Sequence, residues 1–189
     1  MYAVIADPYC YAGTAVLKNI AGLRDAAALE RFETAAVAQR ALEPLPRGRF
    51  GARHYREVHR YLFQDVYRWA SGFRTVRISK GDSMFCYPEH IRAQIAALFS
   101  ELKAKRLLRG LAADAFAVGA AQFLGTLNAI HPFRNGNGRT QLAFLALLAD
   151  RADRPLAFDR LDPEAFLAAM IVSFHGDERP LARAMRALV

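Results

Sequence analysis

The chain has 189 residues, of which 53% are hydrophobic, and a formal net charge of +8. A chain of this length can bury about 70% of its unfolded surface, so one domain over residues 1–189 needs no disulfide framework or structural metal. No apolar run approaches the ~18 residues of a membrane span, and residues 1–11 lack the pattern of a signal peptide. We therefore expect a cytoplasmic protein, with delivery into another cell left open.

The positive charges are mostly arginines that are dispersed along the chain, with denser groups at residues 47–60 and 103–109. Such groups are typical of solvated helix faces, and a surface for an acidic protein partner is the alternative. We do not expect direct binding to nucleic acid. Cys10 and Cys86 lie too far apart for a metal-type spacing, so both are interpreted as reduced thiols.

The first half of the chain predicts three helices. Thr14 can cap a short helix that ends at residues 19–22, and Asp25 can cap an alanine-rich helix that runs to about Leu42. Helical spacing places Leu29, Phe32, Ala36 and Val37 on one face of the second helix. A third helix is expected from about Gly51 to Trp69.

The hydrophobic period then changes from helix to strand. Residues 73–79 alternate as a short strand, residues 80–83 form a turn, and residues 84–87 can return as a second strand. Helices are expected at about 88–105, 112–130, 139–149, 163–174 and 181–189. The pattern therefore predicts an all-α protein of about six to eight helices with one small β-hairpin, whose exposed edge can pair with an extended peptide.

The polar stretch from His131 to Arg139 lies between two apolar helical segments. Gly136 and Gly138 leave main-chain N–H groups open just before a helix, where the helix dipole favours an anion such as phosphate. Arg139 adds a cation that suits phosphate oxygens, and His131 is a candidate general base. His131 precedes a proline, so we expect it in an extended conformation.

The alternative is that the glycines only form a helix–loop–helix corner. The presence of His131, Asn137 and Arg139 in the same stretch argues against this interpretation. The other four histidines are interpreted as structural: His54, His59, His90 and His175.

The stretch from His131 to Arg139 resembles the active-site loop of the Fic family, whose motif is His-x-Phe-x-(Asp/Glu)-Gly-Asn-Gly-Arg-x-x-Arg. Residues 7–19 resemble the N-terminal segment of the toxin-type members. Residues 62–72 and 77–81 resemble their helix and target-docking flap. The resemblance implies an all-helical Fic core with a β-hairpin flap.

The resemblance also implies an activity, the transfer of AMP from ATP to a protein hydroxyl (AMPylation). By matching position, His131 would take the hydroxyl proton, and Arg139 would neutralise the leaving pyrophosphate. Gly136, Asn137 and Gly138 would hold the α- and β-phosphates. The Lys80-Gly81 main chain would help to fix the nucleotide, while the flap near residues 74–87 holds the target protein.

Two positions depart from the family motif. Asn135 stands where the family has the Asp or Glu that binds Mg²⁺, and an amide oxygen is an uncharged ligand for that ion. Leu142 stands where the second arginine would meet the γ-phosphate, and one lost charge-assisted contact costs roughly 1.5–3 kcal/mol. These departures motivate two alternatives: a silent Fic-fold binding module, or a transferase for another nucleotide or phosphate donor, including kinase-like transfer as in Doc relatives.

Regulation by a partner is implied in the same way. Many family members carry an inhibitory helix with the pattern (Ser/Thr)-x-x-x-Glu-(Gly/Asn), and the nearest match, residues 173–178, has Asp177 in place of the Glu. The resemblance therefore points to a small antitoxin protein that supplies such a helix. The inhibitory Glu normally engages the second arginine, so an antitoxin must act differently on Leu142.

Overall fold

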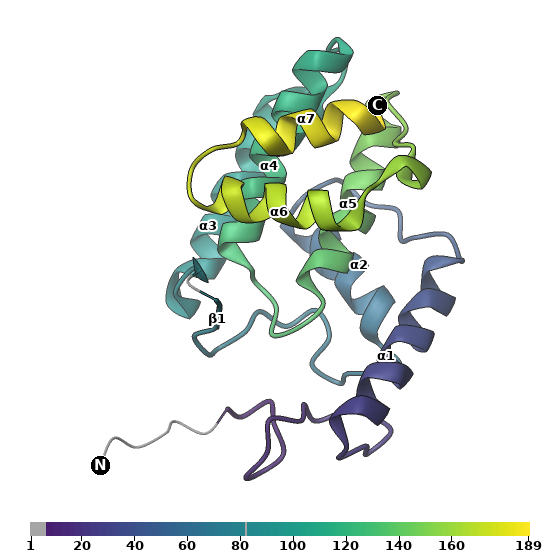
Figure 1. The fold of residues 1–189 in the computed structure, drawn as a ribbon, viewed down its shortest axis with the longest axis vertical. Coiled ribbons are helices and arrows are strands. Elements are labelled where there is room, and N and C mark those ends of the chain that lie inside the picture. The colour runs from purple at the N-terminus through teal and green to yellow at the C-terminus, as the bar shows by residue number, and fades with distance from the viewer. Residues whose placement is uncertain (1–6, 82) are drawn as a thin grey trace.

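The structure is a computed structural model that describes residues 7–81 and 83–189. Seven α-helices, two short strands and two 3₁₀ turns lie in this part of the chain (Figure 1). In chain order they are α1 (Ala26–Ala41), α2 (Ala52–Phe63), β1 (Ser79–Lys80), β2 (Ser83–Met84), α3 (Pro88–Ala104), η1 (Arg106–Leu108), α4 (Ala113–Ile130), α5 (Asn137–Arg151), η2 (Phe158–Arg160), α6 (Pro163–Phe174) and α7 (Arg179–Leu188). The prediction of a mostly helical fold with one hairpin is confirmed.

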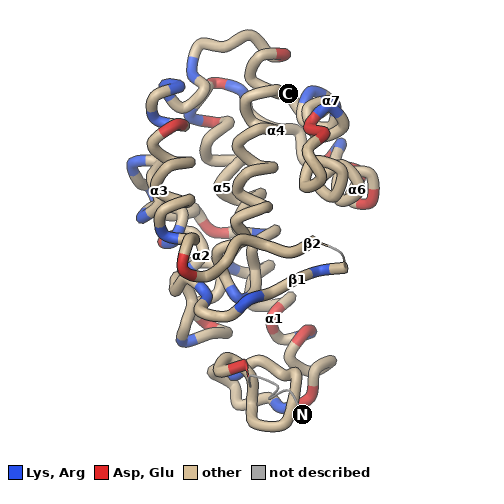
Figure 2. The backbone as a smooth tube through the Cα atoms, turned by 90° about the vertical axis from the view of Figure 1, so that its left-hand side faces the viewer, with Lys and Arg blue, Asp and Glu red and all other residues tan. Residues whose placement is uncertain are grey.

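Helix α4 is the centre of the packing. It contacts α3, α5, α6 and α7, while α2 packs on α5 and α1 packs on α2. Figure 1 shows α6 and α7 crossing in front of α4 and α5, with α1 at the lower right of the view. Lys and Arg residues are spread over α2, α3 and α7 (Figure 2).

Helix starts follow the capping residues in the sequence. The Asp25 carboxylate accepts a hydrogen bond of 2.8 Å from the Ala28 N–H and caps α1. Proline occupies the first turn of α3 and of α6, where its missing N–H costs nothing. These three helices therefore begin where the sequence predicts.

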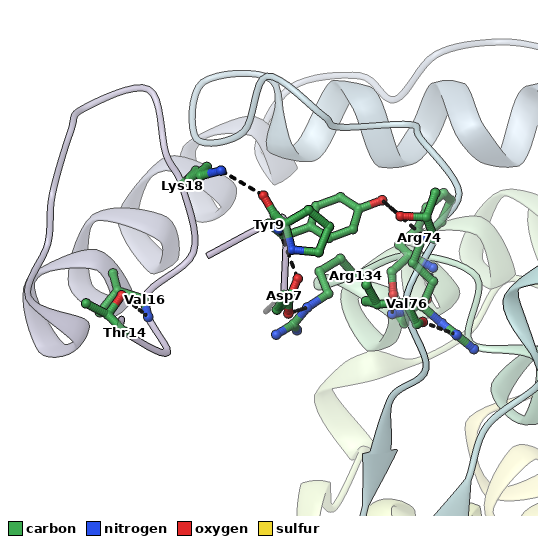
Figure 3. Close-up of polar contacts among 12 residues, drawn as sticks. Asp7, Tyr9, Thr14, Val16, Lys18, Arg74, Val76 and Arg134 are labelled. Atoms are coloured by element: carbon green, nitrogen blue, oxygen red, sulfur yellow. Dashed lines mark hydrogen bonds and ion pairs between the residues drawn. The ribbon is translucent and has the colours of Figure 1, made fainter. Parts of the chain in front are cut away.

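The short helix expected after Thr14 is wrong. The Thr14 hydroxyl donates to the Tyr11 carbonyl and accepts from the Val16 N–H, so it stabilises a turn instead of a helix start (Figure 3). An isolated bridge between Cys10 and Leu17 closes this turn. The local side-chain bonds compete with the helix, as is common for threonine.

The third helix is shorter than expected. α2 ends at Phe63, six residues before Trp69, although the apolar spacing continues. The N–H groups of Val66 and Tyr67 both donate to the Phe63 carbonyl, and the chain turns there. The turn stacks the rings of Tyr67 and Trp69 with centroids 4.2 Å apart, so tertiary packing overrides the helical period.

The predicted hairpin is confirmed, but its strands are shorter than predicted and the paired residues lie closer to the turn. Ser79 pairs with Met84 and Lys80 with Ser83, so the paired residues overlap the expected turn, and Asp82 lies outside the described residues. Beyond one bond of 3.4 Å from the Phe85 N–H to the Ile78 carbonyl, the arms on either side bond to the end of α4 and to the loop that follows it. The Arg74 N–H donates to the Pro132 carbonyl at 2.9 Å, and the Cys86 N–H donates to the Ala129 carbonyl at 3.0 Å.

Across residues 7–81 and 83–189, no helix combines the length and the apolar character that a membrane crossing requires.

Phe144 lies at the centre of an aromatic cluster and is fully buried. Its ring contacts those of Phe50, Tyr55, Phe99 and Phe123 at centroid distances of 5.4–6.1 Å. We expect Phe144→Ala to lower the free energy of unfolding by about 3–5 kcal/mol, because it leaves a cavity in a packed core. Urea unfolding measures this change.

Leu42→Ala is the control for this substitution, because the Leu42 side chain is 83% exposed. We expect it to change the free energy of unfolding by less than about 0.5 kcal/mol. A Phe144→Ala protein as stable as this control would contradict the proposed core.

Candidate functional site

A cavity of about 830 Å³ lies where the α4–α5 loop, the first turn of α5, the hairpin and α6 meet. Figure 2 shows the hairpin directly below α6 on one side of the molecule. The polar residues predicted for the site all line it: Lys80, Gly81, His131, Asn135, Gly136, Asn137, Gly138 and Arg139. The structure thus brings together residues that are up to 59 positions apart in the sequence, from Lys80 to Arg139.

The N-terminus of α5 forms one wall of the cavity. Gly136 is the N-cap, no side chain in the described part of the chain caps this end, and the Thr140 N–H donates to the Gly136 carbonyl. The N–H groups of Asn137, Gly138 and Arg139 have no acceptor among the residues that the structure describes. Unpaired donors at the positive end of a helix dipole favour an anion.

The two glycines of this wall are glycines for different reasons. Gly136 has φ +81°, and a Cβ there would lie 2.3 Å from the Phe63 ring, so the fold itself requires glycine. Gly138 is exposed in the first turn of α5, and a Cβ there would meet no atom within 4 Å. A helical glycine costs roughly 0.5–1 kcal/mol relative to alanine, so the fold offers no reason for glycine at 138.

Asn137 braces the loop from inside. Its Oδ1 accepts from the Phe133 N–H at 2.9 Å and its Nδ2 donates to the Phe133 carbonyl at 2.8 Å. The side chain is buried, so only the main-chain N–H of Asn137 is left for a ligand. Its predicted contact with phosphate therefore reduces to a main-chain contact.

His59 of α2 supports the same loop from behind and lies outside the cavity. Its Nδ1 accepts from the Ser71 N–H at 2.9 Å, which leaves the proton on Nε2 to be donated to the Asn135 carbonyl at 3.0 Å. The ring stacks on Phe133 with centroids 3.7 Å apart. Burial lowers the pKa of His59 to about 4, so the ring is neutral at pH 7.

His131 ends α4 in a left-handed conformation, with φ 47° and ψ 62°. The extended conformation expected before Pro132 is therefore wrong. Left-handed backbone costs a non-glycine residue roughly 1–2 kcal/mol, and tertiary contacts hold it here. The Arg74 guanidinium donates to the His131 carbonyl at 2.8 Å, and the Phe85 ring stacks on the imidazole at 3.9 Å.

The His131 imidazole is neutral at pH 7. Burial lowers its pKa to about 4, with further lowering by the charges of Arg74 and Lys80 against the opposing effect of the Asn128 carbonyl. Its Nδ1 lies 3.3 Å from that carbonyl. A proton on Nδ1 leaves Nε2 as the atom that can accept a proton from a ligand.

Glu33 of α1 holds residues at the start of α5, and the sequence analysis did not identify it. It is only 8% exposed, and it accepts hydrogen bonds from Tyr67, Arg139 and Asn135. Arg139 also lies over the Phe63 ring at 4.8 Å. The signal for Glu33 is its helical spacing of four residues from Leu29 and Val37, which puts an acid on the buried face of α1.

Asn135 is the residue to test as a metal ligand. A carboxylate only accepts hydrogen bonds, so Asn135 must present Nδ2 to Glu33, at 2.8 Å. No donor to Asn135 Oδ1 is found in the described chain. Mg²⁺ keeps several waters and accepts amide oxygens, so this oxygen fits as one neutral ligand of a phosphate-bound ion. Residues 7–81 and 83–189 hold no cluster of three His, Cys, Asp or Glu side chains for a metal.

The cavity differs at its two ends. The polar end holds Arg134, which is ion-paired with Asp7 at 2.7 Å (Figure 3), and Arg139. Leu142 lines the cavity without contributing a charge. At the other end α6 contributes Leu167 and Ile171, each 50% exposed, which the sequence analysis also missed.

Comparisons with known proteins show which family the chain resembles in sequence and in fold. Residues 49–149 match the sequence profile of the Fic/DOC family. The chain is 48% identical over 189 residues to "Probable protein adenylyltransferase y4lH" of Sinorhizobium fredii, covering 100% of this chain and 98% of that protein. It is 37% identical to "Protein adenylyltransferase VbhT" of Bartonella schoenbuchensis, covering 95% of this chain and 38% of VbhT. The crystal structure of the Bartonella tribocorum effector BepC with bound AMPPNP is similar at 26% identity, with a TM-score of 0.85 over 95% of each chain.

The low pKa of His59 predicts a loss of stability in acid. The pKa of His59 is 6.5 in the unfolded chain and about 4 in the folded chain, so folding disfavours the protonated ring. The contribution of His59 to the free energy of unfolding is therefore fully present above pH 6.5. It is lost as the pH falls toward 4, by up to about 3 kcal/mol. We expect His59→Gln, which can still accept from Ser71 and donate to Asn135, to show a smaller drop in urea unfolding between pH 7 and pH 5.

His90→Gln is the matched control, because His90 is exposed. It should follow the wild-type pH dependence. A His59→Gln protein that loses as much stability as wild type on acidification would contradict a buried neutral His59.

Proposed function

The chain belongs to the Fic/DOC family, and from that premise we propose that its cavity binds ATP while His131 initiates transfer of AMP to a hydroxyl of a target protein. The activity is that of a protein adenylyltransferase, which is a nucleotidyltransferase. Residues 1–189 act in this reaction as one domain.

The space in front of Gly138 carries the proposal. An alanine at this position would improve the helix, yet the residue is glycine and its open side lies in the cavity. A phosphate group that approaches the main chain closely accounts for this. The N–H groups of Asn137 and Gly138, after the turn at Gly136, hold the α- and β-phosphates, and Lys80 and Gly81 fix the nucleotide from the flap side.

His131 moves the proton in the reaction. Its Nε2 takes the proton of the target hydroxyl, the hydroxyl oxygen bonds to the α-phosphorus, and the bond from that phosphorus to the bridging oxygen of the β-phosphate breaks. Pyrophosphate leaves against the Arg139 guanidinium and the N–H groups of α5. The bound phosphates raise the basicity of His131, because a nearby anion favours the charged imidazolium.

Asn135 would hold Mg²⁺ that arrives with ATP. Its Oδ1 supplies one neutral ligand, and the phosphate oxygens and waters supply the others. The ion would neutralise part of the phosphate charge. Glu33 fixes the orientation of the Asn135 amide and keeps Arg139 beside the phosphate-binding wall.

The target protein docks on the flap near residues 74–87. The β1–β2 hairpin has only two residues per strand, three of them exposed, so its edge is open to an added strand. Main-chain pairing of this kind places a target side chain without fixing the neighbouring sequence. The cavity beside it then receives the hydroxyl at His131.

A small antitoxin protein is the partner proposed for regulation. It would cover the cavity mouth at Leu142 and the α6 side chains, where the contact is apolar instead of ionic. We place the activity in a cytoplasm, either that of the producing cell or that of a cell that receives the protein. BepC is named as a translocated effector, which supports the second case.

The two glycines give a paired prediction. Gly138→Ala should fold with unchanged or slightly higher stability, by up to about 1 kcal/mol, and lose ATP binding at least tenfold. Gly136→Ala should lose stability itself, because its methyl group meets the Phe63 ring. Isothermal titration with ATP and urea unfolding separate the two effects, and normal ATP binding by Gly138→Ala would contradict the phosphate site.

His131→Ala tests the base. Incubation with α-labelled ATP, Mg²⁺ and cell lysate should label a protein with the wild-type chain, and the substitution should reduce the rate about 10²–10⁴-fold. His90→Ala, an exposed histidine on α3, is the matched control and should label normally. Labelling that does not depend on His131 would disprove its role.

A further inference from the structure

Arg74 is a buried cation that donates its hydrogen bonds to main-chain carbonyls. It is only 2% exposed, and no carboxylate pairs with it within the described residues. Its guanidinium donates instead to four main-chain carbonyls: His131 at 2.8 Å, Val76 at 2.7 Å, Cys86 at 2.6 Å and Ile130 at 3.3 Å. Figure 3 shows the Arg74 side chain reaching back along its own arm toward Val76.

The four carbonyls belong to three segments that meet at His131. Ile130 and His131 form the end of α4, where carbonyls lack intrahelical donors and the dipole favours a cation. Val76 lies on the arm that leads into β1, and Cys86 lies on the arm that follows β2. One side chain thus ties the helix end to both arms of the flap.

We propose that Arg74 is a positioning residue that holds His131 in its left-handed conformation and sets the spacing of the two flap arms around it. The proposal rests on the role of His131 in the proposed function. Four main-chain bonds surround this clamp, and none of them reaches the carbonyl of His131: Arg74 to Pro132, Cys86 to Ala129, His131 to Leu127, and Phe85 to Ile78, which joins the two arms at 3.4 Å. Within residues 7–81 and 83–189, only the Arg74 guanidinium donates a hydrogen bond to that carbonyl.

Lysine cannot replace the guanidinium in this place. Arginine presents five N–H donors in a rigid plane, and Arg74 uses all three of its nitrogen atoms. A lysine ammonium keeps the charge and has three donors on one atom, so it cannot span both flap arms and the helix end. The substitution Arg74→Lys therefore removes the geometry and keeps the charge.

The phosphate-binding wall at the start of α5 is independent of this clamp. Its N–H groups, Arg139 and Glu33 make no hydrogen bond with Arg74 in the described residues, and Arg74 does not line the cavity. Lys80 and Gly81 lie on the flap that the clamp holds, but the phosphates bind on α5. Loss of the clamp should therefore displace the base while leaving most of the ATP affinity in place. A displacement of about 1 Å at a reacting group can cost on the order of 10²-fold in rate.

Arg74→Lys tests the proposal, with Arg68→Lys as the control because Arg68 is exposed. We expect a kcat for label transfer about 10- to 100-fold lower, with the ATP KM and the titrated ATP Kd within about twofold of wild type. Arg68→Lys should match wild type in all three. Wild-type kcat in Arg74→Lys would overturn the proposal. Loss of ATP binding together with transfer would also overturn it, because Arg74 would then serve the fold as a whole.

Guanidinium rescue provides a second measurement. Millimolar guanidinium should restore part of the kcat of Arg74→Ala, whereas methylammonium should not, because only guanidinium has the planar set of donors. Equal effects of the two ions would overturn the proposal. His131→Ala separates this result from the proposed function: normal transfer by His131→Ala defeats that function, whereas inactive His131→Ala with normal Arg74→Lys defeats only the role of Arg74.

Discussion

The side-chain amide of Asn137 holds the loop on which the whole site depends, because it bonds both the N–H and the carbonyl of Phe133. These two bonds close the loop in front of α5. The N-cap of α5 is Gly136, which has no side chain, and no other side chain in the described residues caps this end, so the first N–H groups of the helix face the cavity. Phe133 is in turn fixed between the rings of Tyr55 and His59. The anion-binding wall is therefore positioned by the aromatic core, and its stiffness comes from packing.

Charge is balanced tightly around this wall. Glu33 is a buried carboxylate beside the proposed phosphate site. An unpaired carboxylate in this place would repel an anion. Glu33 accepts from Arg139, Asn135 and Tyr67, so its charge is compensated and it acts as an anchor for the groups that face the ligand. Both histidines near the loop are neutral for the same reason, burial. The remaining donors and cations of the site suit the anionic ligand that we propose.

Local sequence patterns correctly predicted the features that depend on neighbouring residues, such as helix starts. Asp25, Pro88 and Pro163 mark the starts of α1, α3 and α6, and the residues from Gly136 to Arg139 line the cavity at the start of α5. The misses have tertiary causes. α2 ends early, where Tyr67 and Trp69 stack. The paired part of the hairpin is short, and the outer parts of its arms bond mainly to the end of α4 and the loop that follows it. Glu33, His59 and Arg74 reach the loop from distant segments, so no local pattern indicates them, apart from the acid on the buried face of α1. The left-handed backbone of His131 is held by contacts with Arg74 and Phe85. The general preference of a residue before proline takes no account of such tertiary contacts.

The most direct test of the account compares which phosphate of ATP reaches the target. The wild-type chain is incubated with Mg²⁺ and cell lysate in two parallel reactions, one with α-labelled and one with γ-labelled ATP. If the α5 wall holds the α-phosphate beside His131, label from the α position appears on protein and label from the γ position is released as pyrophosphate. Transfer of the γ label to protein, or no transfer of either label by a chain that binds ATP, would contradict the account.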